Sequence, residues 1–257
     1  MAFTDPPYNI KVAGHICGLG KVSHDEFAMA SREMSKAQFT EFLSGFTSAM
    51  LPHLKDGAVL DICMDWRHLG ELLAAIEQNG LSLLNLCAWN KTNGGMGSLY
   101  RSKHELVFIA KKGEAPHTNN VELGKHGRYR TNVWDYAGVN SFGSGRMEDF
   151  ADHPTVKPTA LVADAIRDVT DPGEIVLDAF MGSGTTILAA ERTMRRGFGI
   201  EIAPGYVDVA IRRWMAMTGQ EATLENTDQT FAEVSAERLA ELSADDATQP
   251  PASPASA

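Results

Sequence analysis

Apolar residues along the chain follow two periods, one typical of strands and one typical of helices. Short apolar runs bounded by turn residues predict buried strands, and they cover residues 57–64, 81–89, 106–110, 175–181 and 197–202. Segments whose apolar residues recur every three or four positions predict helices, and they cover residues 35–50, 67–78, 159–169, 186–195 and 204–217. Because strands and helices alternate, we expect a doubly wound, mostly parallel α/β sheet of the Rossmann-like type.

The two ends of the chain depart from this regular pattern. Only four residues precede Asp5, fewer than the five or six of a usual buried strand, so the first strand is expected to be incomplete, as in a piece of a larger polypeptide. Residues 237–257 are rich in Ala, Ser, Asp and Pro, have little to bury and are expected to be disordered. We therefore expect one domain over residues 1–236, followed by an acidic tail.

Composition places the chain among globular proteins. Its 257 residues are enough for one large domain, and 44% of them are hydrophobic. No apolar run approaches the roughly 18 residues of a membrane span, and no secretory signal is present at the N-terminus. The three cysteines lack metal-ligand spacing. We expect a cytoplasmic protein of bacterial or phage type, with no membrane partner and no bound metal.

The formal net charge of −10 is unusual for a protein that binds nucleic acid. From residue 220 onward, eight acidic residues accompany one arginine, so this end accounts for −7 and the rest of the chain carries −3. A weakly acidic domain can still present a local basic surface to phosphate groups. The charge therefore does not exclude a nucleic-acid substrate.

A glycine turn follows the apolar run that starts at Ile175. Gly182 and Gly184 allow a tight turn and a close approach of a ligand to the backbone. The third glycine of the dinucleotide fingerprint is replaced by Ile187, and no lysine follows Gly184 as it would in a P-loop. Glu201, 19 residues after Gly182, is spaced to bind ribose hydroxyls. These features suit a nucleoside ligand without phosphates, such as S-adenosylmethionine; an ordinary strand-to-helix turn is the alternative.

A second motif, Asp5-Pro6-Pro7-Tyr8, stands near the start of the chain. By itself it could be a rigid extended turn with an exposed tyrosine. Together with Phe180-Met181-Gly182-Ser183-Gly184-Thr185 and with the Lys-Pro segment at 153–158, it closely resembles the signature motifs of the DNA amino-methyltransferases. The resemblance covers roughly residues 3–236, and the order of the motifs is similar to that of the permuted beta class.

The resemblance implies a set of site residues. The residues expected to act on the target amine are Asp5, Pro6, Pro7 and Tyr8. The residues expected to bind S-adenosylmethionine are Asp178, Phe180, Gly182, Ser183, Gly184, Thr185, Glu201, Lys157 and Thr159. The resemblance also implies that DNA is the partner, that the protein acts in restriction–modification, and that a homodimer is one expected assembly, since relatives are often dimers.

Two segments are expected to contact DNA. Residues 90–105 combine glycines, cations and a tyrosine ahead of a short strand, and they resemble the family's element at the target-base pocket. Residues 111–150 lack strong periodicity and lie where the permuted class has its target-recognition region. The candidate DNA-binding residues are Lys91, Tyr100, Arg101, Ser102, His104, Arg128 and Arg130. A solvated hairpin loop and a surface insertion are the alternatives for the two segments.

The expected chemistry follows from the poor nucleophilicity of an exocyclic amine. The lone pair of this amine is delocalised into the base, so the site must accept its N–H protons. Asp5 and the Pro6 carbonyl would accept these hydrogen bonds, and Tyr8 would stack on a base flipped out of the duplex. The N6 amine of adenine is the expected target, because the resemblance associates an acid at position 5 with adenine more often than with cytosine.

Three alternatives stay open from the sequence. A cytosine-N4 methyltransferase would use the same fold and the same acceptors. A truncated, non-catalytic module that binds cofactor or DNA would account for the short start of the chain. An RNA or small-molecule methyltransferase is the third, although the basic and aromatic residues between 111 and 146 favour a nucleic acid. No cysteine follows a proline, which excludes the Pro-Cys nucleophile of the cytosine-C5 enzymes.

Overall fold

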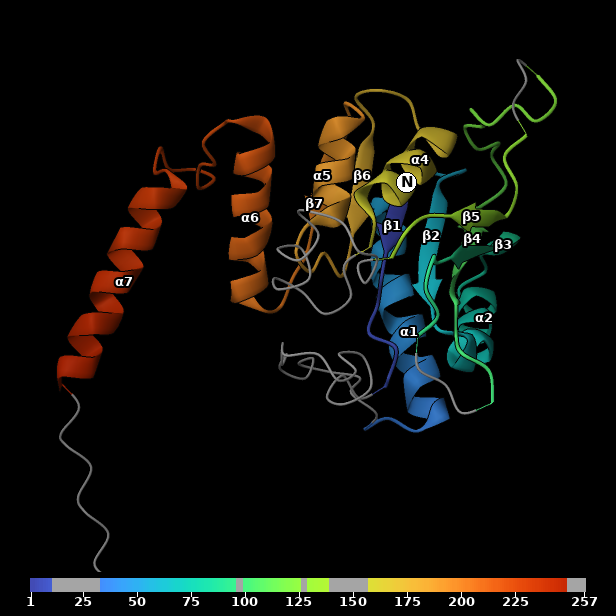
Figure 1. The fold of residues 1–257 in the computed structure, drawn as a ribbon, viewed down its shortest axis with the longest axis horizontal. Helices are drawn as coiled ribbons and strands as arrows, with labels where there is room; N and C mark the ends of the chain where they lie inside the picture. Colours follow the sequence, from blue (N-terminus) through green and yellow to red (C-terminus); the bar gives the residue numbers. More distant parts are fainter. Residues whose placement is uncertain (11–32, 96–98, 126–128, 139–156, 249–257) are drawn as a thin grey trace, which may run out of the picture. The chain divides into compact units, whose positions relative to one another are not determined.

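The computed structural model describes residues 1–10, 33–95, 99–125, 129–138 and 157–248, and Figure 1 shows its elements. The chain divides into two compact units, Met1–Trp214 and Met215–Ala257. The strands are β1 (Ala2–Thr4), β2 (Val59–Met64), β3 (Ser82–Asn90), β4 (His104–Lys111), β5 (Val133–Asp135), β6 (Ile175–Asp178) and β7 (Arg196–Gly199). The helices are α1 (Lys36–Met50), η1 (Leu51–His53), η2 (Trp66–His68), α2 (Leu69–Gln78), α4 (Thr159–Val169), α5 (Thr185–Arg192), α6 (Pro204–Thr218) and α7 (Phe231–Thr248).

The described strands form one seven-stranded sheet in the order β5-β3-β4-β2-β1-β6-β7. β4 is antiparallel to its neighbours β2 and β3, and the other neighbouring strands are parallel. The expectation of a mostly parallel α/β sheet is therefore confirmed. Since β3 is antiparallel to β4 and β4 to β2, the carboxyl ends of β1, β2, β3 and β6 all lie at one edge of the sheet.

Helices cover both faces of the sheet. On one face, α1 and α2 pack on alternate side chains of β2 such as Leu60 and Ile62. On the other face, α4 and α5 pack on side chains such as Phe3 and Cys63. Successive side chains of a strand point to opposite faces, so Ile62 and Cys63 enter different cores. This arrangement confirms the doubly wound architecture.

β1 is a central strand although it has only three residues. It pairs in parallel with β2 and with β6, and all three of its residues are buried. The Met1 ammonium donates a hydrogen bond to the Ile175 carbonyl at 3.0 Å, and the Leu177 amide donates to the Met1 carbonyl at 3.1 Å. Because partners on both sides satisfy its backbone, a strand shorter than expected holds the middle of the sheet.

The structure differs from the sequence expectation at the C-terminal end. Disorder from residue 237 is wrong for 237–248, because α7 continues to Thr248. Thr230 and Glu233 form a capping box at its start, in which the Thr230 amide donates to Glu233 Oε2 at 2.8 Å and the Glu233 amide donates to Thr230 Oγ1 at 3.3 Å. Residues 249–257 lie outside the described residues, and the unit boundary at 214 comes before the expected domain end at 236.

Other elements agree with or refine the expectation. The capping box of Ser35 and Gln38 at the start of α1 is confirmed, and α4 has the expected bounds. β7 ends at Gly199 rather than at 202, α5 ends at Arg192 rather than at 195, and β5 was not predicted. None of the helices in the described part of the chain combines the length and the apolar character of a membrane span.

Asp61 is a buried acid in the middle of β2. Its side chain is 3% exposed, and its Oδ1 atom has no hydrogen-bond partner among the described residues. Burial raises the pKa of Asp61 from 3.8 to about 8; repulsion from Asp168 adds to this effect, and the N-terminal ammonium and Arg130 oppose it. The unfolded chain therefore releases this proton near pH 4 and the folded chain near pH 8. Between these values the free energy of unfolding falls as the pH rises, by up to about 1.4 kcal/mol per pH unit.

We predict that Asp61→Asn removes this loss, because an amide cannot ionise. The difference in the free energy of unfolding, variant minus wild type, should increase steadily from pH 5 to pH 8 in denaturant titrations. The control is Asp208→Asn, which changes an exposed acid on α6 that is paired with Arg212 at 3.5 Å. A difference that stays constant with pH would contradict the assignment.

Gly184 begins α5 with a φ of +83°, a conformation that favours glycine. A Cβ atom at this position would lie 2.6 Å from the Cβ of Ala210 on α6. Gly173 has the same φ of +83° but nothing within 4 Å of its would-be Cβ. An alanine at either position would strain the backbone, but only an alanine at position 184 would also clash with Ala210.

We predict that Gly184→Ala lowers the free energy of unfolding by about 1–3 kcal/mol more than Gly173→Ala does. Ala210→Gly in the Gly184→Ala background should recover part of the extra loss, because it removes the clashing methyl group. Thermal or denaturant unfolding measures all three variants. Equal losses for the two single variants would show that packing against Ala210 contributes nothing.

Candidate active site

The two sequence motifs meet at one edge of the sheet. Asp5 follows the carboxyl end of β1, and the glycine turn at 179–184 follows the carboxyl end of β6. β1 and β6 are parallel neighbours, so both motifs emerge side by side. In open α/β sheets this edge is the usual place for ligands. The two motifs are joined by a hydrogen bond between Thr4 and Asp178, which are 174 positions apart in the sequence.

Asp178 connects the two motifs. The Thr4 hydroxyl donates to its Oδ1 at 3.0 Å, the Phe180 amide donates to the same oxygen at 3.0 Å, and the Thr186 hydroxyl donates to Oδ2 at 2.6 Å. Burial raises the pKa of Asp178 to about 6, and these three hydrogen bonds oppose the rise. Both oxygens of Asp178 hold Thr4, the residue next to Asp5, against the glycine turn. The expectation that Asp178 binds cofactor stays a prediction.

A buried group of charged side chains surrounds Asp5. The Tyr8 hydroxyl donates to Asp5 Oδ1 at 2.5 Å, and the Lys157 ammonium forms an ion pair with Asp5 Oδ2. The same ammonium lies 3.0 Å from Glu105 Oε2 and donates to the Tyr8 hydroxyl oxygen at 3.2 Å. Lys91 pairs with the other oxygen of Glu105. Lys157 thus contacts the Asp5-Pro6-Pro7-Tyr8 motif, and the expectation that it lies near the cofactor stays a prediction.

Electrostatic interactions inside this group shift the pKa values of its two carboxyl groups in opposite directions. Burial raises the pKa of Asp5, opposed by the Lys157 ammonium and reinforced by Glu105. Burial would also raise the pKa of Glu105, but Lys157 and Lys91 outweigh it and lower the pKa to about 2. Burial disfavours the charged form of Lys157, yet Asp5 and Glu105 together raise its pKa. At neutral pH Glu105 is therefore ionised and Lys157 is protonated, and both lie beside Asp5.

Asn9 fixes the end of the Asp5-Pro6-Pro7-Tyr8 motif. Its side-chain amide donates to the Met34 carbonyl at 2.8 Å, and the Met34 amide donates to Asn9 Oδ1 at 3.3 Å. Asn9 has a φ of +53°, which asparagine tolerates better than most residues. Pro6 is buried and Pro7 half-buried. Asn9 and Glu105 were not among the predicted site residues; the asparagine after Tyr8, and the acid before a buried strand, were the available signals.

Glu201 closes the glycine turn from the end of β7. Its carboxylate accepts the Gly182 amide at 2.8 Å with Oε2 and the Ala203 amide at 2.8 Å with Oε1. Phe180 points the other way and packs against Phe42 and Phe46 of α1, with ring centroids 5.9 and 5.1 Å apart. Gly182 and Glu201 are thus brought together as expected from their spacing.

The remaining predicted cofactor residues serve partly to pack the turn. Arg213 of α6 donates to the carbonyl and the hydroxyl of Ser183, at 2.8 Å each. Gly184 lies against α6, and Thr185 is buried at the first position of α5. Within the described part of the chain, no side-chain hydrogen bond caps the start of α5 at Gly184. Thr159 is the first residue of α4 and is half-buried.

The loop between β3 and β4 lies at the same edge as Asp5, because β3 ends there and β4 begins there. Tyr100 is 85% exposed, His104 is exposed and Ser102 is half-buried. Arg101 donates to the carbonyls of Gly94 and Gly95, so it holds the loop together. Lys91 lies over the Trp89 ring, 4.6 Å from its centroid, besides its pair with Glu105.

Residues 111–120 lie toward the opposite edge of the sheet. Lys111 pairs with Val59 at the start of β2, and Lys112 donates to the Leu51 and Leu54 carbonyls, at the opposite edge. Arg130 is 24% exposed, forms an ion pair with Asp168 and lies over the Trp134 ring at 4.8 Å. Arg130 therefore stabilises the fold, and Arg128 lies outside the described residues.

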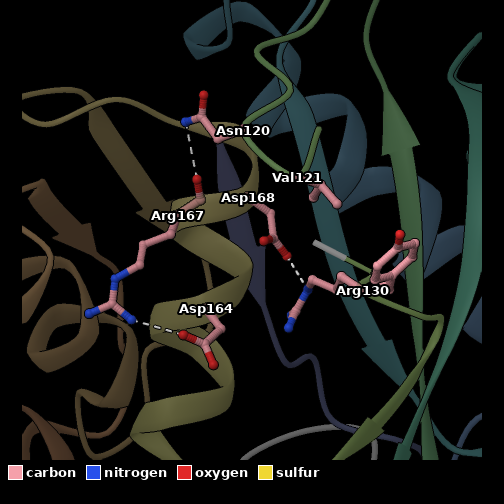
Figure 2. A pocket seen from close by; sticks show the side chains of 7 residues that line it. Asn120, Val121, Arg130, Asp164, Arg167 and Asp168 are labelled. Carbon is pink, nitrogen blue, oxygen red and sulfur yellow. Dashed lines mark hydrogen bonds and ion pairs between the residues drawn. The ribbon is translucent and has the colours of Figure 1, made fainter. Parts of the chain in front are cut away.

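A pocket of about 400 Å³ separates these residues from α4 (Figure 2). It is lined by Asn120, Val121, Tyr129, Arg130, Asp164, Arg167 and Asp168. Figure 2 shows the ion pairs of Arg130 with Asp168 and of Arg167 with Asp164 at its rim. The Asn120 amide donates to the Asp168 carbonyl at 2.8 Å, near the end of α4 that is remote from Lys157. The pocket is thus distinct from the group around Asp5.

Comparison with known proteins agrees with this geometry. The DNA methylase family of N6 and N4 amino-methyltransferases matches residues 1–212. The type II methyltransferase M2.DpnII of Streptococcus pneumoniae is 29% identical over 222 residues, which cover 83% of this chain and 81% of that protein. The type II methyltransferase M.HpaI of Haemophilus parainfluenzae is 26% identical over 227 residues, covering 83% of this chain and 67% of that protein.

Two solved structures show the same fold. The complex of M1.HpyAVI with SAM superposes with a TM-score of 0.60 at 24% identity, covering 83% of this chain and 87% of that chain. The cytosine-N4-specific PvuII DNA methyltransferase gives a TM-score of 0.64 at 18% identity, covering 88% of this chain and 80% of that chain. With the family match over residues 1–212, this chain belongs to the N6/N4 DNA methylase family.

Proposed function

We propose that this DNA methyltransferase transfers a methyl group from S-adenosylmethionine to the N6 amine of adenine. The observation that carries the proposal is the position of Asp5. Its half-buried carboxylate lies beside the glycine turn, linked to it through Thr4 and Asp178. An acceptor for the target amine and a turn suited to a nucleoside thus share one edge of the sheet.

The residues of the turn fit S-adenosylmethionine. A carboxylate offers about four acceptor positions, and Glu201 uses two of them on backbone amides, which leaves capacity for ribose hydroxyls. The uncapped start of α5 suits the carboxylate of the methionine part, because helix N-termini favour anions. When bound, S-adenosylmethionine supplies a methyl group on a positively charged sulfur.

Residues of the Asp5-Pro6-Pro7-Tyr8 motif then position the amine of the target base, which receives the methyl group. Asp5 and the Pro6 carbonyl accept its two N–H groups, which directs the nitrogen lone pair toward the methyl carbon. The nitrogen–carbon bond forms as the carbon–sulfur bond breaks, and the electron pair of that bond goes to sulfur. The amine loses one proton, which Asp5 can accept before it passes to water. Tyr8 stacks on the base, which must leave the duplex to reach this edge.

The loop at 91–103 is proposed to meet the DNA beside the flipped base. It lies at the edge of Asp5 and exposes Tyr100, and His104 is exposed at the start of β4. An aromatic ring on an exposed loop suits stacking with an unpaired base. The cytosine-N4 amine is the second candidate target, favoured by the similarity of the fold to the cytosine-N4-specific PvuII enzyme.

Analysis of methylated nucleosides tests the proposal. The purified protein is incubated with methyl-labelled S-adenosylmethionine and unmethylated DNA of mixed sequence, and the DNA is digested to nucleosides. Label in N6-methyldeoxyadenosine is the expected result. Label in N4-methyldeoxycytidine would keep the mechanism and change the base, and the absence of label in DNA would contradict the proposed function.

We predict that Asp5→Asn lowers the rate of methyl transfer at least about 100-fold, because the amide is a weaker acceptor and carries no charge. The Kd for S-adenosylmethionine, measured by calorimetry, should change less than about threefold. Asp171→Asn, an exposed acid at the opposite edge, is the control and should keep the wild-type rate. Near-wild-type turnover by Asp5→Asn would remove Asp5 from the catalytic role.

We predict that Glu201→Ala weakens the binding of S-adenosylmethionine at least about tenfold, because a charged hydrogen bond to ribose hydroxyls is lost. Calorimetry measures the Kd directly, without DNA. The matched control is Glu174→Ala, which removes an acid at the opposite end of β6, paired there with Lys55. An unchanged Kd in Glu201→Ala would rule out the ribose contact.

A further inference from the structure

Lys157 is a nearly buried lysine whose ammonium lies between two carboxylates, those of Asp5 and Glu105. Its side chain is 6% exposed, and its ammonium contacts Asp5 Oδ2 and, at 3.0 Å, Glu105 Oε2. The three residues come from the end of β1, the start of β4 and the turn before α4. A buried ammonium is expensive unless its charge is paired, so this contact is a strong constraint on the site.

Both oxygens of Asp5 already accept a donor from the protein. Tyr8 donates to Oδ1 at 2.5 Å, and Lys157 occupies Oδ2. An incoming amine that takes the position of the ammonium at Oδ2 competes with a charge-assisted contact. If Asp5 were the only anion near Lys157, releasing the ammonium would leave it unpaired inside the protein, at a cost of several kcal/mol.

Glu105 removes that cost. Its Oε2 already lies 3.0 Å from the ammonium, so Lys157 can lose Asp5 and keep an anionic partner. Lys91 holds the other oxygen of Glu105 and lies over Trp89, which keeps Glu105 in place. Two acids and two lysines make the group neutral as a whole, and any exchange of partners inside it leaves the net charge unchanged.

We propose that Lys157 is a positioning residue for Asp5. When the amine of the target base replaces the Lys157 ammonium at Asp5, Glu105 keeps that ammonium paired. The inference rests on the proposed function, since it assumes that Asp5 receives the amine. It replaces the expectation that Lys157 binds the methionine part of the cofactor. Its consequence is a coupling: the charge on Lys157 lowers the pKa of Asp5 against the effect of burial, and the charge on Glu105 lets Lys157 leave.

The acidity of Asp5 reports on this coupling. The groups that face Asp5 are Tyr8 from its own turn, Glu105 from β4, Cys63 from β2, Lys157 before α4 and Asp178 from β6. Lys157 lowers the pKa of Asp5, and Glu105 raises it. Removing the lysine charge and removing the glutamate charge must therefore move the pKa of Asp5 in opposite directions.

The experiment compares Lys157→Met, Glu105→Gln and the double variant in pH profiles of kcat/KM for DNA. Lys157→Met should move the acid limb to higher pH by about one unit or more, because Asp5 loses its cation. Glu105→Gln should move it to lower pH and reduce kcat about tenfold or more, because Lys157 then stays on Asp5. The double variant should return the limb toward the wild-type position, and Lys157→Arg should keep it there.

Two further measurements separate the alternatives. The Kd for S-adenosylmethionine by calorimetry should stay within about threefold of wild type in Lys157→Met; a large increase with an unmoved acid limb would overturn the inference and return Lys157 to the cofactor. Lys55→Met, which removes an exposed lysine at the opposite edge, should alter neither quantity. Equal loss of rate at every pH in both single variants would show a structural role only.

The carboxyl-carbon NMR signal of Asp5 gives the same answer without turnover. Protein labelled with carbon-13 aspartate is titrated, and the signal is assigned by its loss in Asp5→Asn. Opposite shifts of the Asp5 pKa in Lys157→Met and Glu105→Gln are expected, and shifts in one direction would overturn the inference. If Lys157→Met does not fold, Glu105→Gln alone tests the sign. Absence of DNA methylation by the wild-type protein would contradict the proposed function, and this titration would still test the coupling.

Discussion

The site depends on the hydrogen bonds to one buried carboxylate, that of Asp178. It joins the end of β1, through Thr4, to the glycine turn and to the first turn of α5, through Phe180 and Thr186. A buried carboxylate needs hydrogen-bond donors, and Thr4, Phe180 and Thr186 provide them to Asp178. Because Asp5 is the next residue after Thr4, the position of the acceptor relative to the glycine turn follows from this contact.

A second constraint is the charge balance around Asp5. Lys157 and Lys91 pair with Asp5 and Glu105, and Lys157 is the most deeply buried of the four. Inside a protein such contacts are strong and their loss is costly, so the group holds one geometry until a ligand offers an equivalent contact. The same balance opposes the rise that burial causes in the pKa of Asp5.

Much of this arrangement could be predicted from local patterns. The bounds of α4, the capping box of α1 and the turn between β6 and α5 depend on neighbouring residues, so the sequence carries them directly. β5 escaped prediction because three residues carry no period, and α7 because the capping box of Thr230 and Glu233 was overlooked beside a composition typical of disorder. Arg130 was expected to bind DNA because it lies in the expected target-recognition region, and this expectation stays a prediction. Its contacts with Asp168 and Trp134 could not be predicted from the sequence, because they depend on packing.

The sequence by itself determined the class of fold, the family resemblance and the identity of the two motifs, because periodicity and motif spacing are local properties of the chain. Tertiary structure decided which charges meet. Lys157 and Glu105 are 52 positions apart and both lie far from Asp5 along the chain, so only the strand order β4-β2-β1-β6 brings them together. The partner of a buried charge is set by packing, and that is why the contacts of Lys157 with Asp5 and Glu105 could not be predicted from the sequence.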